Sequence, residues 1–193
     1  SDVYKRQEIY NALKIGIEAF NCESLQEIFV INEMAHLHGV KANISVRINP
    51  DIDAHTHKYV TTGLYENKFG ISNHEFDKLI EFIQKSEHIE FFGLHFHIGS
   101  QITRVEEVFS LECKRVNEIV RYFESQGLTV KNINLGGGLG VDYDDPDGNP
   151  IADFGTWFKA ISDNIVRRPD QNVHIEPGRS LVAQCASLIS RVL

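Results

Sequence analysis

The sequence predicts an α/β fold that holds part of a parallel (β/α)8 barrel of the TIM type. Helical and extended patterns alternate along the whole chain, without a linker or a low-complexity tract between them. The apolar runs that read as strands recur about every 25 to 50 residues, which is the spacing of such barrels. The 193 residues fall short of the roughly 250 that a complete barrel needs. We therefore expect the chain to enter in mid-barrel and to stop as a second domain begins.

Capping signals and one-sided apolar faces predict four helices. Ser24 and Glu27 form a capping box that opens the first helix, which ends at Gly39. Ser72 and Glu75 open the second in the same way, and the third ends before Gly127. The apolar faces of the last three helices hold these residues: Phe76, Leu79, Ile80 and Ile83; Val116, Ile119, Val120 and Phe123; Phe154, Trp157, Phe158, Ile161 and Ile165.

Five short apolar runs between and around the helices predict strands. They comprise residues 19–22, 44–48, 91–98, 130–135 and 173–175. After Gly178 the apolar stretch 181–193 breaks this pattern, so it is expected to leave the barrel for a different element. We therefore assign residues 1–180 to the partial barrel and 181–193 to the start of another domain.

The composition favours a protein that acts on small molecules. A formal net charge of −8 and a pI near 5.6 argue against a nucleic-acid or anionic-membrane partner, which would require a basic surface. Cys22, Cys113 and Cys185 are too few and too irregularly spaced for a disulfide framework or a zinc site, which indicates a reducing compartment. No run approaches the ~18 apolar residues of a membrane span, and the charged N-terminus is unlike a signal peptide. We expect a cytoplasmic protein.

The residues that follow the predicted strands are the candidates for chemistry, because active sites of parallel α/β folds lie beyond the carboxyl ends of the strands. Gly136, Gly137 and Gly138 follow the fourth run and can present backbone N–H groups to an anion. Ser100 follows the third run, and Arg179 follows the fifth. Together they predict a phosphate. The glycine-rich nucleotide fingerprints are incomplete, and a tight turn without a ligand is the alternative for the triplet alone.

Three further strand-end residues indicate which phosphate-containing ligand the site would bind. Glu176 ends the fifth strand beside the predicted phosphate site, and a carboxylate there needs a cationic partner. His97 and His95 end the third run and share one face of it by alternation. A protonated ring nitrogen suits Glu176, and a flat ring suits His97. Pyridoxal 5'-phosphate offers a phosphate, a pyridine nitrogen and a ring face together, so it is the predicted cofactor.

Several strings in the chain resemble the diaminopimelate decarboxylase family. They are F-H-I-G-S-Q (96–101), N-L-G-G-G-L-G (134–140), E-P-G-R-S-L-V-A (176–183), R-I-N-P-D-I-D-A-H-T-H-K-Y (47–59) and E-N-K-F-G-I (66–71). The resemblance covers nearly all of the chain from about Glu8 onward. It implies an alanine-racemase-like barrel that here lacks the first strands and a C-terminal β domain, of which 181–193 would be the start. It also implies loss of carbon dioxide from meso-diaminopimelate to give L-lysine, by a protein that forms a homodimer at full length.

The resemblance assigns roles to the strand-end residues. It implies that His97 stacks on the cofactor ring and that Glu176 pairs with the pyridine nitrogen, which makes these two the catalytic candidates. The phosphate would be held by Ser100, Gly136, Gly137 and Gly138, within a cofactor site that includes Pro177 and Gly178. Arg179 would reach both the phosphate and the substrate carboxylate. No metal is expected.

Two strings are set aside as false matches to the family's remaining catalytic residues. Lys41, in V-K-A-N, precedes a predicted strand and so lies at the wrong face of the barrel for a Schiff-base lysine. Cys22, in C-E-S, lies where the barrel has a similar string, and its Ser24 is a helix cap. We expect the catalytic lysine upstream of Ser1 and the catalytic cysteine downstream of Leu193.

Other interpretations remain open beside this one. Asp51, Asp53, His55 and His57 have the chemistry of metal ligands, but they crowd one loop that the resemblance explains as lying beside the substrate. The aspartates of 142–147 lack calcium-loop spacing and predict a solvated turn. The alternative functions are decarboxylation of another basic amino acid (ornithine, arginine or carboxynorspermidine) and non-catalytic binding of pyridoxal phosphate.

Overall fold

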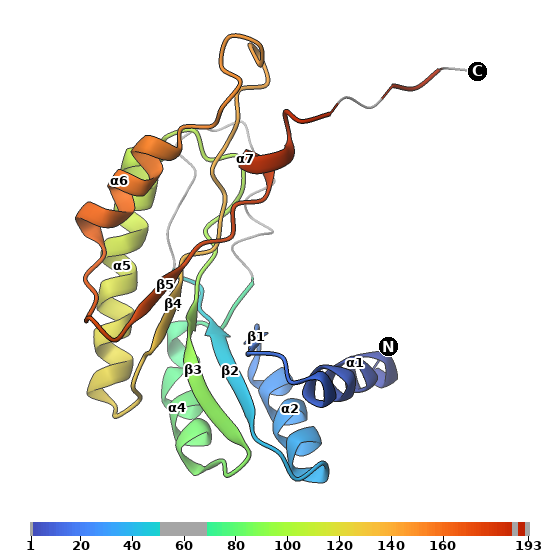
Figure 1. Ribbon diagram of the computed structural model, residues 1–193. Helices are drawn as coiled ribbons and strands as arrows, with labels where there is room; N and C mark the ends of the chain where they lie inside the picture. The colour runs from blue at the N-terminus through green and yellow to red at the C-terminus, as the bar shows by residue number, and fades with distance from the viewer. Residues whose placement is uncertain (1, 51–68, 187–188, 192–193) are drawn as a thin grey trace.

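The computed structural model describes residues 2–50, 69–186 and 189–191. Its centre is a five-stranded sheet in the order β1-β2-β3-β4-β5, and Figure 1 shows the strands and helices alternating along the chain. The strands are β1 (Phe20–Cys22), β2 (Ala42–Arg47), β3 (Ile89–His95), β4 (Asn132–Asn134) and β5 (Asn172–His174). The helices are α1 (Asp2–Ile15), α2 (Leu25–Leu37), the 3-10 turn η1 (Asn73–Glu75), α4 (Phe76–Lys85), α5 (Val105–Ser125), α6 (Phe154–Asn164) and α7 (Arg179–Val182). The α/β prediction is confirmed.

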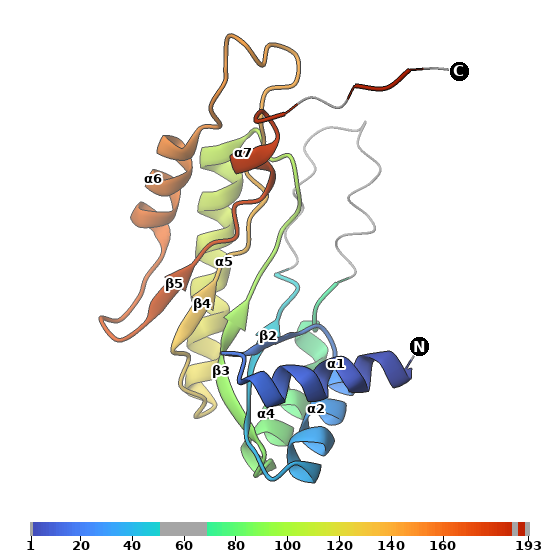
Figure 2. The same cartoon turned by 45° about the vertical axis from the view of Figure 1, so that its right-hand side comes forward.

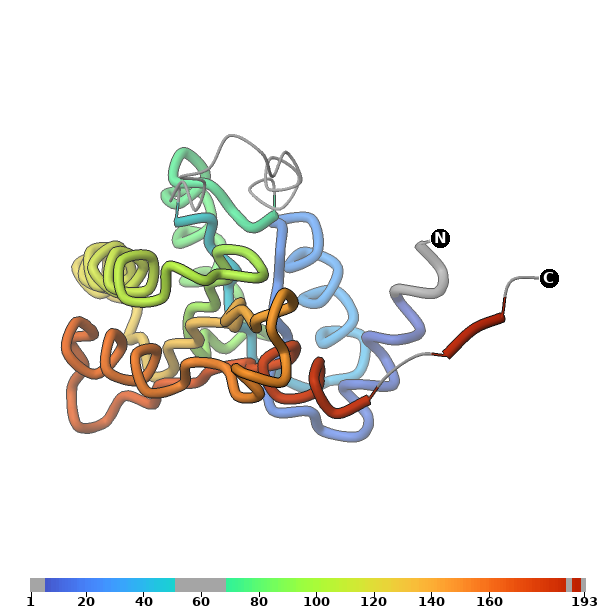
Figure 3. The backbone as a smooth tube through the Cα atoms, turned by 90° about the horizontal axis from the view of Figure 1, so that it is seen from above, coloured from blue at the N-terminus to red at the C-terminus, as the bar shows by residue number. Residues whose placement is uncertain are grey.

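Every pair of neighbouring strands is parallel, and the order in the sheet follows the order in the chain. The pairing sets Phe20 opposite Ile44, Leu94 opposite Ile133, and Ile133 opposite Val173. Helices α2, α4, α5 and α6 form an arc around the strands when the molecule is viewed from above (Figure 3). Sequential parallel strands with helices outside them are the arrangement of a barrel wall. The predicted partial barrel is therefore confirmed, with β1 and β5 as the two edges of the described sheet.

The helix caps follow the sequence prediction at one place and depart from it at another. Ser24 Oγ accepts a hydrogen bond from the backbone N–H of Glu27 at 3.2 Å and so caps α2 as expected. The capping box predicted at Ser72 is wrong. The Ser72 hydroxyl donates instead to the carboxylate of Glu75 at 3.2 Å, residues 73–75 form a 3-10 turn, and α4 begins only at Phe76.

The predicted apolar faces pack against the sheet and form most of the core. Leu79 of α4, Phe123 of α5 and Trp157 of α6 are almost completely buried. Phe158 is the exception with half of its surface exposed, because its position next to Trp157 turns it about 100° away from the buried stripe. None of the helices in the described part of the chain has the length and apolar character that a membrane span requires.

Three features differ from the sequence expectations. Helix α1 is not predicted, and it packs on α2, where Arg6 and Glu33 form an ion pair at 2.9 Å. Strand β3 ends at His95 instead of residue 98, although the Phe96 N–H still donates to Asn134 O at 2.8 Å. The apolar stretch after Gly178 opens with the short helix α7, where Leu181 and Val182 are 55% and 65% exposed.

Candidate active site

The carboxyl ends of the strands meet at one edge of the sheet, where the loops of Figure 2 rise above the strand arrows. Arg47 closes β2, His95 closes β3 and Asn134 closes β4. Glu176 follows two residues after the end of β5. Because parallel strands all present this end to the same edge, side chains that are far apart in the sequence become neighbours there.

The glycine triplet lies where three strand-end loops press against one another. A Cβ atom on Gly136 would meet Phe96 O at 2.4 Å, one on Gly137 would meet Glu176 O at 2.2 Å, and one on Gly138 would meet Gly99 O at 2.4 Å. Gly136 and Gly138 also have positive φ angles of 66° and 102°. Glycine is therefore needed at all three positions because neighbouring backbone lies too close for a side chain. The sequence did not reveal this reason.

The N–H groups of the first two glycines are engaged within the protein. Gly136 N–H donates to Asn134 Oδ1 at 2.8 Å, and Gly137 N–H points to His97 Nδ1 at 3.4 Å. An anion cradle at this loop would therefore draw on Gly138 together with side chains nearby, rather than on all three glycines. The same bonds bring the half-buried His97 ring against the glycine loop, as the prediction of one shared site requires.

Both oxygens of the Glu176 carboxylate are contacted by side chains at the ends of β3 and β4. Asn134 Nδ2 donates to Oε1 at 2.8 Å, and His95 Nε2 lies 3.4 Å from Oε2. The backbone N–H of Glu176 also donates to Gly136 O at 2.6 Å. This carboxylate is therefore held in place while 46% of its side-chain surface is still exposed to a ligand.

His95 is almost completely buried, with 8% of its side chain exposed. Burial lowers the pKa of its imidazole, because the charged form loses hydration. The neighbouring Glu176 carboxylate acts in the opposite direction, whereas the positive charge of Arg47 lowers the pKa further. His95 is therefore a neutral ring at physiological pH.

Arg179 lies beside Ser100, as the phosphate prediction requires. Its Nη2 donates to Ser100 Oγ at 3.0 Å, and its Nη1 donates to the hydroxyl of Tyr143 at 3.2 Å. Its guanidinium also lies 5.8 Å from the centre of the Tyr143 ring. A hydroxyl and a cation held together at an exposed loop are donors that suit a phosphate group. Sequence reasoning missed Tyr143, which lies in the acidic turn and carries no signal of its own.

An ion pair at the same edge was also missed. The guanidinium of Arg47 pairs with the carboxylate of Glu23, which directly follows β1. The same guanidinium lies over the ring of Phe69 at 5.4 Å. Both charged residues lie at the end of a predicted strand or directly after it, and this position could have identified them as candidate site residues.

Two false matches lie where the sequence analysis expected. Lys41 directly precedes Ala42, the first residue of β2, and so lies at the amino end of the sheet, opposite the strand-end cluster. Cys22 is completely buried, and this burial raises the pKa of its thiol far above the usual range. Neither residue has the surroundings of a catalytic group.

The Asp142 carboxylate of the acidic turn bonds within that turn, although Tyr143 of the same turn contacts Arg179. Asp142 Oδ1 accepts N–H groups of Asp144 and Asp145 at 2.9 and 3.0 Å, which makes a self-capped turn. The described ranges contain no group of three or more potential metal ligands. The loop with Asp51, Asp53, His55 and His57 lies outside the described residues.

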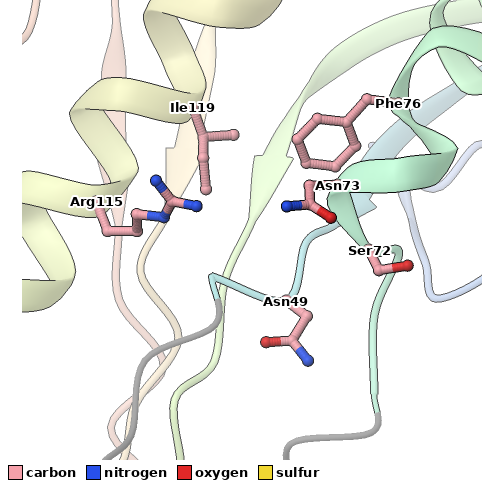
Figure 4. Close-up of a pocket in the computed structure, with 6 residues that line it drawn as sticks. All are labelled: Asn49, Ser72, Asn73, Phe76, Arg115 and Ile119. Atoms are coloured by element: carbon pink, nitrogen blue, oxygen red, sulfur yellow. The ribbon is translucent and has the colours of Figure 1, made fainter.

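Figure 4 shows a pocket of about 180 Å³ between the start of α4, the middle of α5 and Asn49, which follows β2. Its lining consists of Asn49, Ser72, Asn73, Phe76, Arg115 and Ile119. Arg115 is engaged there, because its Nε donates to Pro50 O at 3.2 Å and its Nη1 to Glu118 at 2.6 Å. None of the residues predicted for the cofactor lines this pocket.

The residues at the strand ends fit pyridoxal phosphate. Ser100 and Arg179 together could donate to an anion, and a Cβ at any glycine of the triplet would collide with neighbouring backbone. Glu176 offers a fixed carboxylate for a ring nitrogen, and His97 offers a flat ring beside the glycine loop.

Comparisons with known proteins agree with this chemistry. Residues 1–183 match the family described as "Pyridoxal-dependent decarboxylase, pyridoxal binding domain". The chain is 47% identical over 186 residues to the diaminopimelate decarboxylase of Bacteroides thetaiotaomicron, and 40% identical over 187 residues to that of Pseudomonas aeruginosa. These alignments cover 96% and 97% of this chain but 48% and 44% of the relatives. The chain thus spans about half the length of the curated relatives it matches.

Among solved structures, the fold resembles diaminopimelate decarboxylase from Helicobacter pylori, which was crystallised in complex with L-lysine. The TM-score is 0.78 and the sequence identity 37%, over 92% of this chain and 44% of that one.

Proposed function

Because the chain belongs to the pyridoxal-dependent decarboxylases, through their pyridoxal-binding domain, we propose that the complete protein removes carbon dioxide from meso-diaminopimelate and releases L-lysine. Membership of this family carries with it the pyridoxal phosphate cofactor that the sequence predicts. The observation that carries the proposal is the meeting of Glu176 and the Arg179–Ser100 pair at one sheet edge. The substrate rests on the name shared by the relatives, at 47% and 40% identity.

The described side chains would divide the work of binding. Ser100, Arg179 and the Gly136–Gly138 loop would hold the phosphate, the loop through the N–H of Gly138, next to Pro177 and Gly178. His97 packs its ring against the cofactor ring. Bound pyridoxal phosphate supplies the electron sink that makes loss of carbon dioxide feasible. Glu176 keeps a proton on the pyridine nitrogen, which strengthens that sink, and so acts with His97 as a catalytic residue.

Arg179 carries the substrate part of the proposal, because a guanidinium can donate to two anionic groups at once. Its outer nitrogens already reach two different hydroxyl groups, on Ser100 and Tyr143. A phosphate and the substrate carboxylate would replace or join these partners. The loop 51–68, which we expect beside the substrate, lies outside the described residues.

We also propose how the rest of the protein is organised. Residues 181–193 would lead into a β domain that covers the exposed Leu181 and Val182, and the complete protein would be a cytoplasmic homodimer. The catalytic lysine and cysteine would lie outside these 193 residues.

The test is a comparison of specificity constants for meso-diaminopimelate, ornithine and arginine, measured on the complete protein loaded with pyridoxal phosphate. A site built to pair a second carboxylate rejects substrates without it by several orders of magnitude. A ratio near one, or one that favours ornithine or arginine, would assign the protein to the other basic amino-acid decarboxylases. Cofactor binding without turnover of any of the three would favour a non-catalytic carrier.

A further inference from the structure

The contacts of Glu176 assign a role to two residues that touch neither substrate nor cofactor in the function proposed above. The carboxylate is contacted by residues at the ends of β3 and β4. Asn134 contacts Oε1 at 2.8 Å, and His95 contacts Oε2 at 3.4 Å.

The hydrogen on His95 can be assigned from its surroundings. An ionised carboxylate can only accept hydrogen bonds, so the nitrogen that faces Glu176, Nε2, must carry the hydrogen. The other ring nitrogen, Nδ1, is buried and has no hydrogen-bond partner among the described residues. A second proton, on that nitrogen, would give a charged ring with a buried N–H group that has no acceptor, which costs free energy. The ring is therefore a neutral donor with a fixed tautomer.

The orientation of Asn134 is fixed in a similar way. Its Oδ1 accepts the N–H of Gly136 at 2.8 Å, so its Nδ2 is turned to Glu176. One amide thus links the glycine loop to the carboxylate. The backbone bond from Glu176 N to Gly136 O, at 2.6 Å, ties the same two loops a second time.

We propose that His95 is a positioning residue, which together with Asn134 keeps the Glu176 carboxylate aimed at the pyridine nitrogen. The inference rests on the proposed function, in which that nitrogen is the partner of Glu176. Two neutral donors suit this task, because they fix both oxygens without adding a positive charge that would compete with a protonated ring nitrogen. An arginine at either position would hold the carboxylate equally well but weaken its pull on that proton.

The test is a double-mutant cycle in the complete protein, with His95→Leu and Glu176→Gln alone and combined. We expect His95→Leu to lower kcat about 10- to 100-fold, since one hydrogen bond to a charged group is lost. His95→Gln, which keeps an N–H near the position of Nε2, should recover most of this loss. In the Glu176→Gln background, His95→Leu should lower kcat by less than about twofold, because residues that act through one another are not additive.

A matched control is His174→Leu. This histidine is the last residue of β5, two strands from β3, and its Nε2 lies 3.1 Å from Asn132 Oδ1. Its effect on kcat should be the same in both backgrounds. If His95→Leu is equally harmful with and without the Glu176 charge, its role is packing, and the proposal is overturned.

A readout without turnover uses nitrogen-15 NMR of the histidine rings in the same protein without cofactor. We expect the hydrogen of His95 on Nε2, and a further fall in its pKa in Glu176→Gln, because the carboxylate favours the protonated ring. A hydrogen on Nδ1 of His95, or a His95 pKa that is unchanged in Glu176→Gln, would refute the inference. This arm also separates the two proposals: if the wild type decarboxylates another substrate or none, the proposed function fails while the NMR result still decides on His95.

Discussion

Asn134 and Glu176 are 42 residues apart in the sequence and are joined side chain to side chain at the carboxyl ends of β4 and β5, with Asn134 Nδ2 donating to Glu176 Oε1 at 2.8 Å. Parallel pairing of the two strands, with Asn134 opposite His174, sets this distance. The bond gives Glu176 a defined position although almost half of its side chain is exposed. A surface carboxylate without such partners would sample many rotamers, so its fixed position is a property of the site.

Removing the charge of Glu176 should impair the reaction without abolishing cofactor binding. Glu176→Gln keeps the size of the side chain, and the Arg179–Ser100 contact proposed for the phosphate does not involve this carboxylate. We expect kcat of the complete protein to fall by about 10- to 100-fold or more, which corresponds to one lost charged hydrogen bond. The measurements are kcat and a fluorescence titration with pyridoxal phosphate. Glu90→Gln, an exposed glutamate of β3 near the amino end of the sheet, is the control; equal kcat values for the two variants would contradict the role of Glu176.

Exchange of Arg179 for lysine should be harmful although the charge is kept. An ammonium cannot reproduce the planar fork that now reaches Ser100 and Tyr143 with two different nitrogens. We expect the cofactor affinity to fall about tenfold and kcat/KM to fall further. The corresponding substitution Arg121→Lys, at an exposed position of α5, should leave both constants unchanged. Wild-type constants for Arg179→Lys would show that only the charge matters.

A methyl group at Gly137 should disturb the fold and the site together. The added Cβ would lie 2.2 Å from Glu176 O, and backbone on both sides must shift to admit it. We expect Gly137→Ala to lower the free energy of unfolding by about 1–3 kcal/mol and to weaken pyridoxal phosphate binding. Denaturant titration measures the first effect. At Gly155 in helix α6 an added Cβ would lie 3.8 Å from Asp153 Oδ1, an ordinary contact, so Gly155→Ala should be neutral or stabilising.

Glu112 should make the protein less stable as the pH rises. It is completely buried in α5, neither carboxylate oxygen has a partner among the described residues, and desolvation raises its pKa well above the usual value. Between the unfolded pKa and the higher folded one, the folded state keeps a proton that the unfolded state releases, so stability falls through that window as the pH increases. The stabilisation is fully present only below the unfolded value of about 4.3.

Glu112→Gln should remove this slope, because the amide does not titrate. The measurement is the free energy of unfolding of the complete protein between pH 5 and pH 8. We expect the wild type to lose at least about 1 kcal/mol more than the variant over this range. Glu106→Gln, on the exposed face of the same helix, should keep the wild-type slope. Parallel curves for wild type and Glu112→Gln would mean that Glu112 finds a partner in the complete protein.

By itself, the sequence determined the alternation of strands and helices, the buried faces of α4 and α5, and the loops that carry Ser100, the glycine triplet, Glu176 and Arg179. These follow from local chemistry: apolar periodicity is read from neighbours three or four residues apart, and glycine or proline marks where a strand must stop. The end of β3 was placed three residues too late, because the apolar run continues after the ladder ends.

Only the tertiary structure decided which of these loops touch. His95 meets Glu176 across 81 residues of chain, and Arg179 meets Ser100 across 79. Such contacts depend on strand register and on how closely the loops pack, which no local pattern encodes. The need for glycine at position 137 also depends on a distant contact, because a side chain there would collide with the backbone carbonyl of Glu176. A glycine triplet in a sequence can bind an anion through its N–H groups or allow another loop to pack closely against it. The distance between the two loops in the structure shows whether close packing requires the glycines.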